Sequence, residues 1–246
     1  MIKVENLRAG YGDGPDVLQG VSLNANQSEI LIILGPNGCG KSTLIKTIAG
    51  YLRPREGTIA LDGMDLSSVP IEQKVTDHGF AYVPQVDNVF PALTVLENIK
   101  LGARRLATGE AKERTEELFD HYPALAKKQN QAASALSGGE RQILSLSRAL
   151  VTKPKVLLLD EPSAGLSPKA MHELFDEILA IKQRRGICII MVEQNAAEAL
   201  RIGDRGLILQ LGKVAMEGPV SNLLGNPQVR ELYLGVSAGH ADVELA

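Results

Sequence analysis

Residues 35–43 read Gly35-Pro36-Asn37-Gly38-Cys39-Gly40-Lys41-Ser42-Thr43, which fits the phosphate-binding pattern G-x-x-x-x-G-K-[ST]. The five apolar residues before it, 30–34, predict a buried parallel strand. Residues 42–49 after it contain neither Gly nor Pro and are followed by Gly50, which predicts a short helix. Because a glycine loop between a strand and a helix points backbone N–H groups at a bound anion, this stretch predicts a phosphate cradle.

The residue types within this cradle predict how it would hold a nucleotide. Lys41 would reach the β- and γ-phosphates, and the Ser42 hydroxyl would hold Mg²⁺. Cys39 lies beside the helix start and Lys41, and both features lower the pKa of a thiol. The thiol is therefore either reactive or, as a small space-filling group, inert. We expect nucleotide contacts from Asn37, Gly38, Cys39, Gly40, Lys41, Ser42 and Thr43.

Further strands are expected on both sides of the cradle. The patterns that predict them are at residues 2–7, 21–25, 57–61, 80–83 and 187–192, with a hairpin over 207–216. The turn-rich stretch 9–15 holds Tyr11, in a chain with only 4% aromatic residues. This ring either packs on the sheet or stacks on a flat ligand ring, and its position alone leaves both open.

The sequence becomes helical in character near residue 88. Thr94 and Glu97 form a capping box that opens a helix, a charged helical run covers 110–119, and 124–135 is helical or loosely so. Leu136-Ser137-Gly138-Gly139-Glu140 contains a second capping box and, at its helix start, another anion-binding end. We expect a helical sub-domain at about 88–151, inserted into a core of about 1–87 and 152–235 that is followed by a tail at 236–246.

Acidic and polar residues follow two of the predicted buried strands. Asp160 and Glu161 end the run that starts at Val156, and Gln194 follows the strand at 187–192. The carboxyl ends of parallel strands are where α/β sheets bind ligands. Asp160 suits a Mg²⁺ ligand shared with Ser42, by analogy with P-loop NTPases. Glu161 suits a general base that positions water.

Composition and charge exclude several classes of protein. The chain has 246 residues, 44% hydrophobic and 22% charged, which is ordinary for a globular protein. Its net charge of -3 does not indicate the basic surface that nucleic-acid binding requires. No apolar run approaches the ~18 residues of a membrane-spanning helix. Residues 1–6 have no signal-peptide layout, so we expect a cytoplasmic location. Cys39 and Cys188 lie far apart, which argues against a disulfide scaffold.

On the cradle, the 136–140 motif and the acidic strand end, the chain resembles the ATP-binding subunits of ABC transporters over residues 2–235. The resemblance implies an α/β fold: a P-loop NTPase (RecA-like) core with N-terminal antiparallel β-strands and the helical insertion. It implies ATP and Mg²⁺ as cofactors and hydrolysis by Lys41, Glu161 as the base and Gln194 at the switch position. Tyr11 would stack on adenine, and Gln85 would link Mg²⁺ to a membrane partner.

The same resemblance implies partners. Ser137 and Gly139 would contact the γ-phosphate held by a second ABC ATPase subunit, either a homologous chain or another copy. Transmembrane permease subunits, and indirectly a solute-binding protein, would complete the assembly, with this chain peripheral on the inner face of the cell membrane and no nucleic acid involved.

Three residues that differ from the usual family pattern indicate which subgroup of the family the chain resembles. Gln194 stands where His is usual, Ser167 where the D-loop usually ends in Asp, and Glu140 where the signature has Gln. Together with residues 229–235, these features are similar to the branched-chain amino acid importer ATPases and their relatives that serve urea or short amides. The alternative is an ABC-type ATPase of another transporter.

Two other classes were weighed. A DNA-associated ABC ATPase needs a long coiled coil between the cradle and the acidic strand, and residues 51–155 contain no sustained heptads. A non-hydrolysing regulatory module is disfavoured because Lys41, Asp160 and Glu161 are all present.

Overall fold

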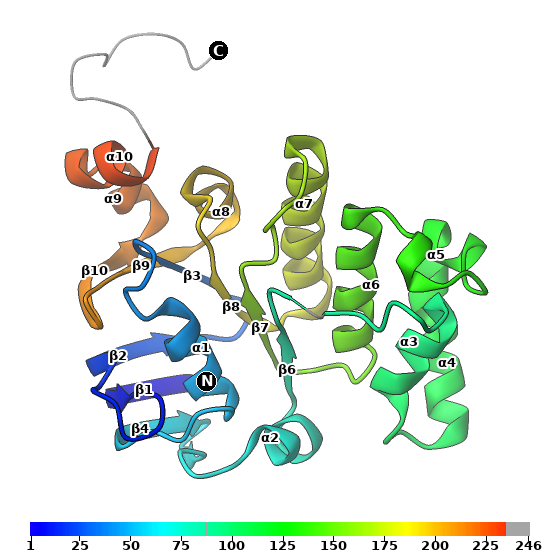
Figure 1. Cartoon of the computed structure of the whole chain (residues 1–246), viewed down its shortest axis with the longest axis horizontal. Helices are drawn as coiled ribbons and strands as arrows, with labels where there is room; N and C mark the ends of the chain where they lie inside the picture. Colours follow the sequence, from blue (N-terminus) through cyan, green and yellow to red (C-terminus); the bar gives the residue numbers. More distant parts are fainter. Residues whose placement is uncertain (87, 235–246) are drawn as a thin grey trace, which may run out of the picture.

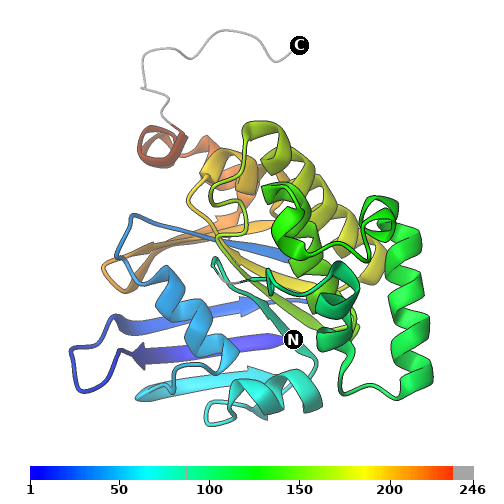
Figure 2. The same ribbon diagram turned by 45° about the vertical axis from the view of Figure 1, so that its right-hand side comes forward.

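The computed structural model describes residues 1–86 and 88–234, and it contains two β-sheets with helices between and beside them (Figures 1 and 2). The tail expected at 236–246 lies outside the described residues. In both views α1 (Lys41–Ala49) lies between the two sheets. The helix that follows the cradle is therefore buried, with the cradle at its start.

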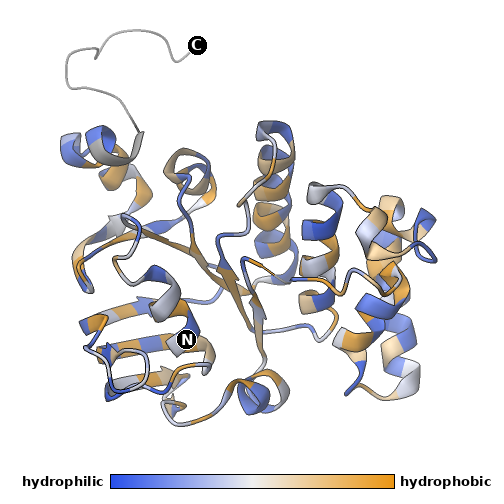
Figure 3. Cartoon of the chain, viewed as in Figure 1, coloured by the Kyte–Doolittle hydropathy of each residue, from blue (hydrophilic) through white to orange (hydrophobic). Residues whose placement is uncertain are grey.

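The larger sheet has the strand order β10-β9-β3-β8-β7-β6. Strands β9, β3, β8, β7 and β6 are parallel, and β10 pairs antiparallel with β9 at one edge. The bounds are β3 (Ile30–Leu34), β6 (Phe80–Val83), β7 (Val156–Asp160), β8 (Cys188–Val192), β9 (Arg205–Gln210) and β10 (Lys213–Pro219). Figure 3 shows the central strands β3, β8 and β7 in the hydrophobic colour over most of their length. The expected strands and hairpin are confirmed, with β9 and β10 longer than expected.

The smaller sheet is antiparallel, with the order β2-β1-β4-β5. It consists of β1 (Ile2–Ala9), β2 (Leu18–Ala25), β4 (Glu56–Leu61) and β5 (Met64–Asp65). The expected N-terminal antiparallel strands are thus confirmed. β1 and β2 extend further than the sequence indicated because Ala9 pairs with Leu18, and both side chains are buried.

The apolar run of β3 is explained by its two buried faces. Ile30, Ile32 and Leu34 belong to a core with the helices α6 (Gly138–Leu150) and α7 (Pro168–Arg185). Leu31 and Ile33 belong to a second core, which α1 and the smaller sheet complete. Successive side chains of a strand point to opposite faces, so a central strand covered on both sides is apolar throughout.

The segment after residue 88 is helical, and it lies beside β6 (Figure 1). It contains α3 (Val95–Ala103), α4 (Thr108–His121), α5 (Pro123–Lys127), a 3₁₀ turn (Ala133–Ala135) and α6. The expectation for 124–135 is only partly right. The carbonyls of Gln129 and Gln131 accept hydrogen bonds from the N–H groups of Leu96 and Val95 at the start of α3, so the chain leaves the helix there.

The remaining helices are α2 (Ile71–Asp77), which the sequence analysis did not predict, α8 (Ala196–Ile202), α9 (Val220–Gly225) and α10 (Pro227–Leu234). The last two of these helices, α9 and α10, are separated at Asn226. Pro227 has no N–H to continue α9, and the Asn226 side chain accepts from the Gln228 N–H instead. Across the described ranges, no helix is both long and apolar enough to span a membrane.

Candidate functional site

The cradle, the acidic pair and Gln194 come together because β3, β8 and β7 are neighbouring parallel strands. Their carboxyl ends meet at one edge of the sheet. β3 leads into the cradle, β8 leads to Gln194, and β7 ends at Asp160 with Glu161 next. The sheet register therefore brings together residues that lie far apart in the chain.

The cradle requires glycine where β9 approaches it. A Cβ on Gly35 would lie 2.3 Å from the Leu209 carbonyl oxygen and 2.6 Å from the Cys39 sulfur. No larger residue fits there without moving the backbone. The Lys41 Nζ donates to the Gly35 carbonyl at 2.8 Å and to the Pro36 carbonyl at 3.3 Å, so its ammonium lies over the loop.

Ser42 and Asp160, which the sequence predicts as ligands of one Mg²⁺, are in direct contact. The Ser42 hydroxyl donates to Asp160 Oδ1 at 3.2 Å, and the Tyr82 hydroxyl donates to Asp160 Oδ2 at 3.0 Å. Burial, together with the charge of Asp160, raises the pKa of the Tyr82 hydroxyl. Tyr82 therefore stays a neutral donor that fixes the carboxylate of Asp160 in place.

Glu161 has a backbone φ of +45°, which is unusual for a residue other than glycine. Such a conformation costs about 1–3 kcal/mol and persists only where neighbouring groups hold it. Its N–H donates to the Val192 carbonyl at 2.9 Å, and its Oε2 accepts from the Gln85 side chain at 2.7 Å. The Glu161 carboxylate is thus tied to the loop after β6.

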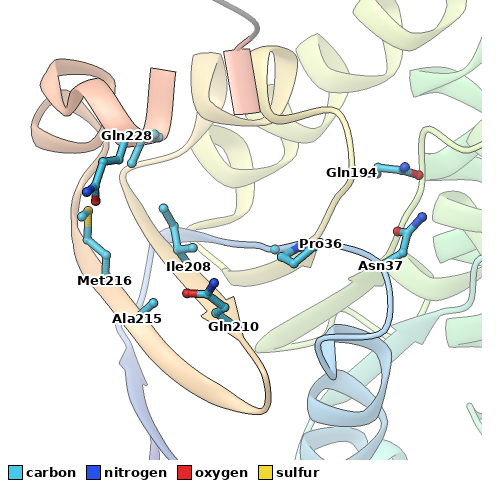
Figure 4. Close-up of a pocket in the computed structure, with 10 residues that line it drawn as sticks. Pro36, Asn37, Gln194, Ile208, Gln210, Ala215, Met216 and Gln228 are labelled. Carbon is cyan, nitrogen blue, oxygen red and sulfur yellow. The ribbon is translucent and has the colours of Figure 1, made fainter. Parts of the chain in front are cut away.

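Gln194 and Asn37 line the same cavity of about 460 Å³, in which Met216 and Gln228 lie toward the opposite side (Figure 4). Gln194 does not cap the following helix, because the Asn195 side chain accepts from the Glu198 N–H at the start of α8. The Gln194 side chain is therefore placed beside the cradle with no capping role to explain it.

The structure bears differently on the sequence predictions for Tyr11 and Cys39, two residues at the cradle. The Tyr11 ring is 50% exposed, and its hydroxyl lies 3.5 Å from the Thr43 hydroxyl, so it borders the cradle rather than packing into the core. The Cys39 thiol is buried, and burial raises its pKa although Lys41 acts in the opposite direction. The expected lowering of the thiol pKa is thus wrong, because desolvation outweighs the nearby charge.

Ser137 and Gly139 lie away from the cradle of their own chain. Both capping-box hydrogen bonds between Ser137 and Glu140 are present, as predicted. Ser137 and Gly139 line a cavity of about 630 Å³ with Leu166 and Ser167, whereas Gly35 and Asn37 line the separate cavity of Figure 4. Ser167 caps α7, because its side chain accepts a hydrogen bond from the Ala170 N–H.

Four polar residues with no role predicted from the sequence support these loops: Tyr82, Gln142, Ser163 and Glu193. Gln142 on α6 donates to the Pro162 carbonyl at 2.6 Å, directly after Glu161. Glu193 is buried and accepts hydrogen bonds from the Ser163 loop. The one available signal was a polar residue inside an otherwise apolar segment, as in Phe80-Ala81-Tyr82-Val83.

The fold and this edge of the sheet define a P-loop nucleotide-binding domain. The sequence profile described as ABC transporter matches residues 18–164, which is more than half of the chain. The chain belongs to the ABC transporter family, as an ATP-binding subunit that hydrolyses ATP. The expectations of family, fold and ATP hydrolysis are therefore confirmed.

Individual relatives match over nearly their whole length. The chain is 40% identical to the probable branched-chain amino acid transport ATP-binding protein LivF of Archaeoglobus fulgidus, covering 96% of this chain and 99% of that protein. It is 37% identical to the high-affinity branched-chain amino acid transport ATP-binding protein BraG of Pseudomonas aeruginosa, covering 96% and 100%. It is 34% identical to the lipopolysaccharide export system ATP-binding protein LptB of Haemophilus influenzae, covering 96% and 97%.

Solved structures of ATP-binding cassettes have the same fold as this chain. A nucleotide-free ATP-binding cassette from an ABC transporter superposes with a TM-score of 0.84 at 27% identity, covering 96% of this chain and 99% of that one. A dimeric ATP-binding cassette in a post-hydrolysis state, bound to ADP and Pi, superposes with a TM-score of 0.77 at 27% identity, covering 89% and 99%.

Proposed function

We propose that this chain powers an ABC importer for branched-chain amino acids or related small polar solutes. The observation that carries the proposal is the near full-length similarity to LivF and BraG, at 40% and 37% identity. The export protein LptB is less similar, at 34% identity.

In this proposal the residues at the sheet edge divide the work of hydrolysis. The backbone N–H groups of the cradle and Lys41 bind the phosphates of ATP. Glu161 accepts the proton of the attacking water, and Gln85 and the Val192 carbonyl hold Glu161 in position. Gln194 offers a neutral N–H₂ donor and a C=O acceptor beside the γ-phosphate, and the exposed Tyr11 ring stacks on adenine.

The contact between Ser42 and Asp160 fits a Mg²⁺ site. One hydroxyl and one carboxylate are oxygen donors of the kind Mg²⁺ prefers, with the rest of its coordination left to phosphates and waters. Mg²⁺, when bound there, would neutralise charge that develops on the phosphates. Tyr82 holds the Asp160 carboxylate for this role through its hydrogen bond.

Assembly with partners completes the proposal. Ser137 and Gly139 face a cavity separate from their own cradle, so we infer that they close over the cradle of a second ATPase subunit, either a homologous chain or another copy. ATP bound between the two would favour the closed pair. The loop that carries Gln85 and the helices α3–α6 would contact permease subunits, with this chain at the inner face of the cell membrane.

The assignment of Glu161 is tested by Glu161→Gln. The isosteric amide cannot accept a proton, so turnover should fall at least 100-fold while ATP binding remains. Steady-state ATPase assays and nucleotide titration measure the two effects. Turnover within a few-fold of the unmodified protein would place the base elsewhere.

The substrate class is tested on the assembled transporter. The chain should co-purify with its permease subunits, and the ATPase of the reconstituted complex should be stimulated by a solute-binding protein loaded with leucine. Urea and spermidine serve as competing solutes in the same assay. Stimulation by either of these in place of leucine would move the substrate to a neighbouring importer class, and co-purification with lipopolysaccharide-export subunits would contradict import.

A further inference from the structure

One buried carboxylate joins two loops that border the proposed hydrolysis site. Glu193 is only 1% exposed, and it follows β8 directly. Its Oε1 accepts from the Ser163 N–H at 2.9 Å, and its Oε2 accepts from the Ser163 hydroxyl at 2.9 Å. Oε2 also accepts from the N–H groups of Gln194 at 3.1 Å and Asn195 at 3.4 Å. A single side chain therefore receives four hydrogen bonds from two separate segments.

The first segment is the loop after Glu161. Glu161 has a left-handed backbone, and such a conformation needs support from its surroundings. The Ser163 bonds to Glu193 fix the chain two residues after Glu161, and the Glu161 N–H bond to Val192 fixes it before. Both supports come from the end of β8, so the base and β8 move together.

The second segment carries Gln194. The peptide N–H groups of Gln194 and Asn195 both point at the Glu193 carboxylate, which sets the direction in which this loop leaves β8. Glu161, Ser163, Glu193 and Gln194 also line one small cavity of about 340 Å³. The loop after Glu161 and the loop that carries Gln194 thus face each other across this cavity. The four hydrogen bonds of the Glu193 carboxylate, which we call the Glu193 clamp, join the two loops at the buried end of the cavity.

We propose that Glu193 is a positioning residue for ATP hydrolysis, whose carboxylate holds Glu161 and Gln194 in one fixed arrangement. This inference rests on the proposed roles of Glu161 and Gln194. Glu193 itself does not contact ATP in this proposal, because its carboxylate is buried and already accepts four hydrogen bonds from the protein.

Glu193→Gln is the sharpest substitution, because it keeps the shape and removes one acceptor. An amide has a single acceptor oxygen, and its N–H₂ group would face a backbone N–H of Ser163, Gln194 or Asn195. Two donors that face each other in a buried place repel, so one of the two loops must separate from the clamp. The cradle does not depend on these bonds and should still bind ATP.

We therefore expect Glu193→Gln to lower kcat for ATP hydrolysis at least tenfold, with the ATP affinity and KM within threefold of the unmodified protein. Amide hydrogen exchange should become faster at Ser163, Gln194 and Asn195, while β7 and β8 stay protected. Ser163→Ala removes only the hydroxyl and should have a smaller effect. The double variant should resemble Glu193→Gln alone, because both changes open the same clamp.

Glu29→Gln is the matched control. Glu29 is also a buried carboxylate, and it accepts from the Asn26 N–H and from Arg205 at the opposite end of the sheet. This variant should keep its kcat, which shows that altering a buried carboxylate is not in itself inhibitory. Thermal unfolding of each variant shows that it is folded.

Two results would overturn the inference. One is a folded Glu193→Gln variant with kcat within threefold of the unmodified protein. The other is an equal loss of kcat, ATP affinity and melting temperature, which would make Glu193 a general stability residue. Failure of the proposed function is a different result, in which the unmodified protein shows no Glu161-dependent hydrolysis. The exchange measurement still tests the clamp in that case.

Discussion

The Cys39 thiol lies inside the cradle, yet its surroundings make it a poor nucleophile. Its side chain is 3% exposed, and burial raises its pKa above the ordinary value. A higher pKa leaves less thiolate at neutral pH, and the thiolate is the reactive form. Of the two readings that the sequence left open, the space-filling one is therefore favoured.

Alkylation tests this directly. We expect iodoacetamide at pH 7.5 to leave Cys39 unmodified in the folded protein, with full ATPase activity retained and no effect of Mg-ATP. Cys188 is a control within the same chain, because it is fully buried and burial raises its pKa to about 12. Both thiols should react in denaturant. Peptide mapping that finds Cys39 alone modified in the native protein, with loss of activity, would restore the reactive-thiol hypothesis.

Lys74 is a fully buried lysine with one hydrogen-bonding role. Its Nζ donates to the Ile48 carbonyl at 2.8 Å, near the end of α1, and lies 5.7 Å from the centre of the Phe80 ring. Burial lowers the pKa of Lys74 from 10.5 to about 8, although Asp65 acts in the opposite direction. Between these two pH values the unfolded chain binds more protons than the folded protein does at this residue.

The free energy of unfolding should therefore rise with pH from about 8 to about 10.5, because the penalty of burying the charge disappears over this interval. Below about pH 8 Lys74 is charged in the folded protein, so the cost of burying that charge lowers the free energy of unfolding by its full amount. Lys74→Met has an uncharged side chain of similar length and should lack this rise. Urea unfolding of both proteins at pH 7.5, 8.5, 9.5 and 10.5 gives the difference, in which the other titrating groups cancel. Parallel curves for the two proteins would refute the prediction.

At the scale of elements, patterns with a local physical cause were predictable. The capping boxes at Thr94 and Ser137 are both present, and Gly186 ends α7 in a left-handed conformation as a helix C-terminal glycine does. The interruption at 128–132 was not predictable, because its cause is the pair of hydrogen bonds from the start of α3. The extent of the buried face of α6 also depends on its neighbours: Leu144, Leu146 and Leu150 are buried, whereas Ile143 is only partly buried.

For the site too, features with a local cause in the sequence were predictable and features that depend on distant partners were not. Residues within one motif, such as Lys41 and Ser42, were identified because their spacing is fixed along the chain. Tyr82 and Glu193 act through partners 78 and 30 positions away, and only the sheet register brings those partners close. Composition and periodicity carry no information on such pairs.

The loop between β8 and α8 contains both Gln194, the proposed switch residue, and Asn195, the residue that caps α8. Asn195 caps α8, so Gln194→Ala should not destabilise that helix. We expect Gln194→Ala to slow hydrolysis at least tenfold, a barrier rise of about 1.4 kcal/mol or more, with ATP binding retained. Asn195→Ala is the complementary control and should lower stability by about 1 kcal/mol. Unchanged turnover in Gln194→Ala would remove this residue from the mechanism.

A histidine at the same position adds a test by pH. Gln194→His should keep hydrolysis and add an inflection to the pH–rate profile near the ordinary histidine pKa of about 6.5, because an imidazole titrates there and an amide does not. Turnover measured from about pH 5.5 to 8.5 covers this range. A profile that stays flat where the unmodified protein is flat would show that the side chain does not act on the γ-phosphate.

At the scale of the whole molecule, the two cores meet at the central strands of the larger sheet, and each anion-binding helix start belongs to a different core. α1 packs in the core with the smaller sheet, and α6 packs in the core with α7. The beginning of the cradle (residues 35–37) and the start of α6 border separate cavities. In the proposed function, Ser137 therefore does not complete the cradle of its own chain, and a second subunit supplies that contact.

Mixing two inactive variants tests the shared site. Lys41→Ala removes the cradle ammonium, and Ser137→Arg places a bulky charge on the exposed start of α6. Each alone should be nearly inactive. In a mixed dimer, however, the intact cradle of the Ser137→Arg copy faces the intact Ser137 of the other copy. With random pairing of isolated copies, about one quarter of the original activity should return, because half of the dimers are mixed and each has one complete site of two.

ATPase activity after mixing equal amounts in the presence of ATP is the measurement, with thermal unfolding to show that both variants are folded. Doubling one variant against a fixed amount of the other should shift the recovered activity as random pairing predicts. A mixture no more active than its components would mean that two copies of this chain do not share a site. The second subunit would then have to be a homologous partner, and the same exchange of variants can be repeated with that chain.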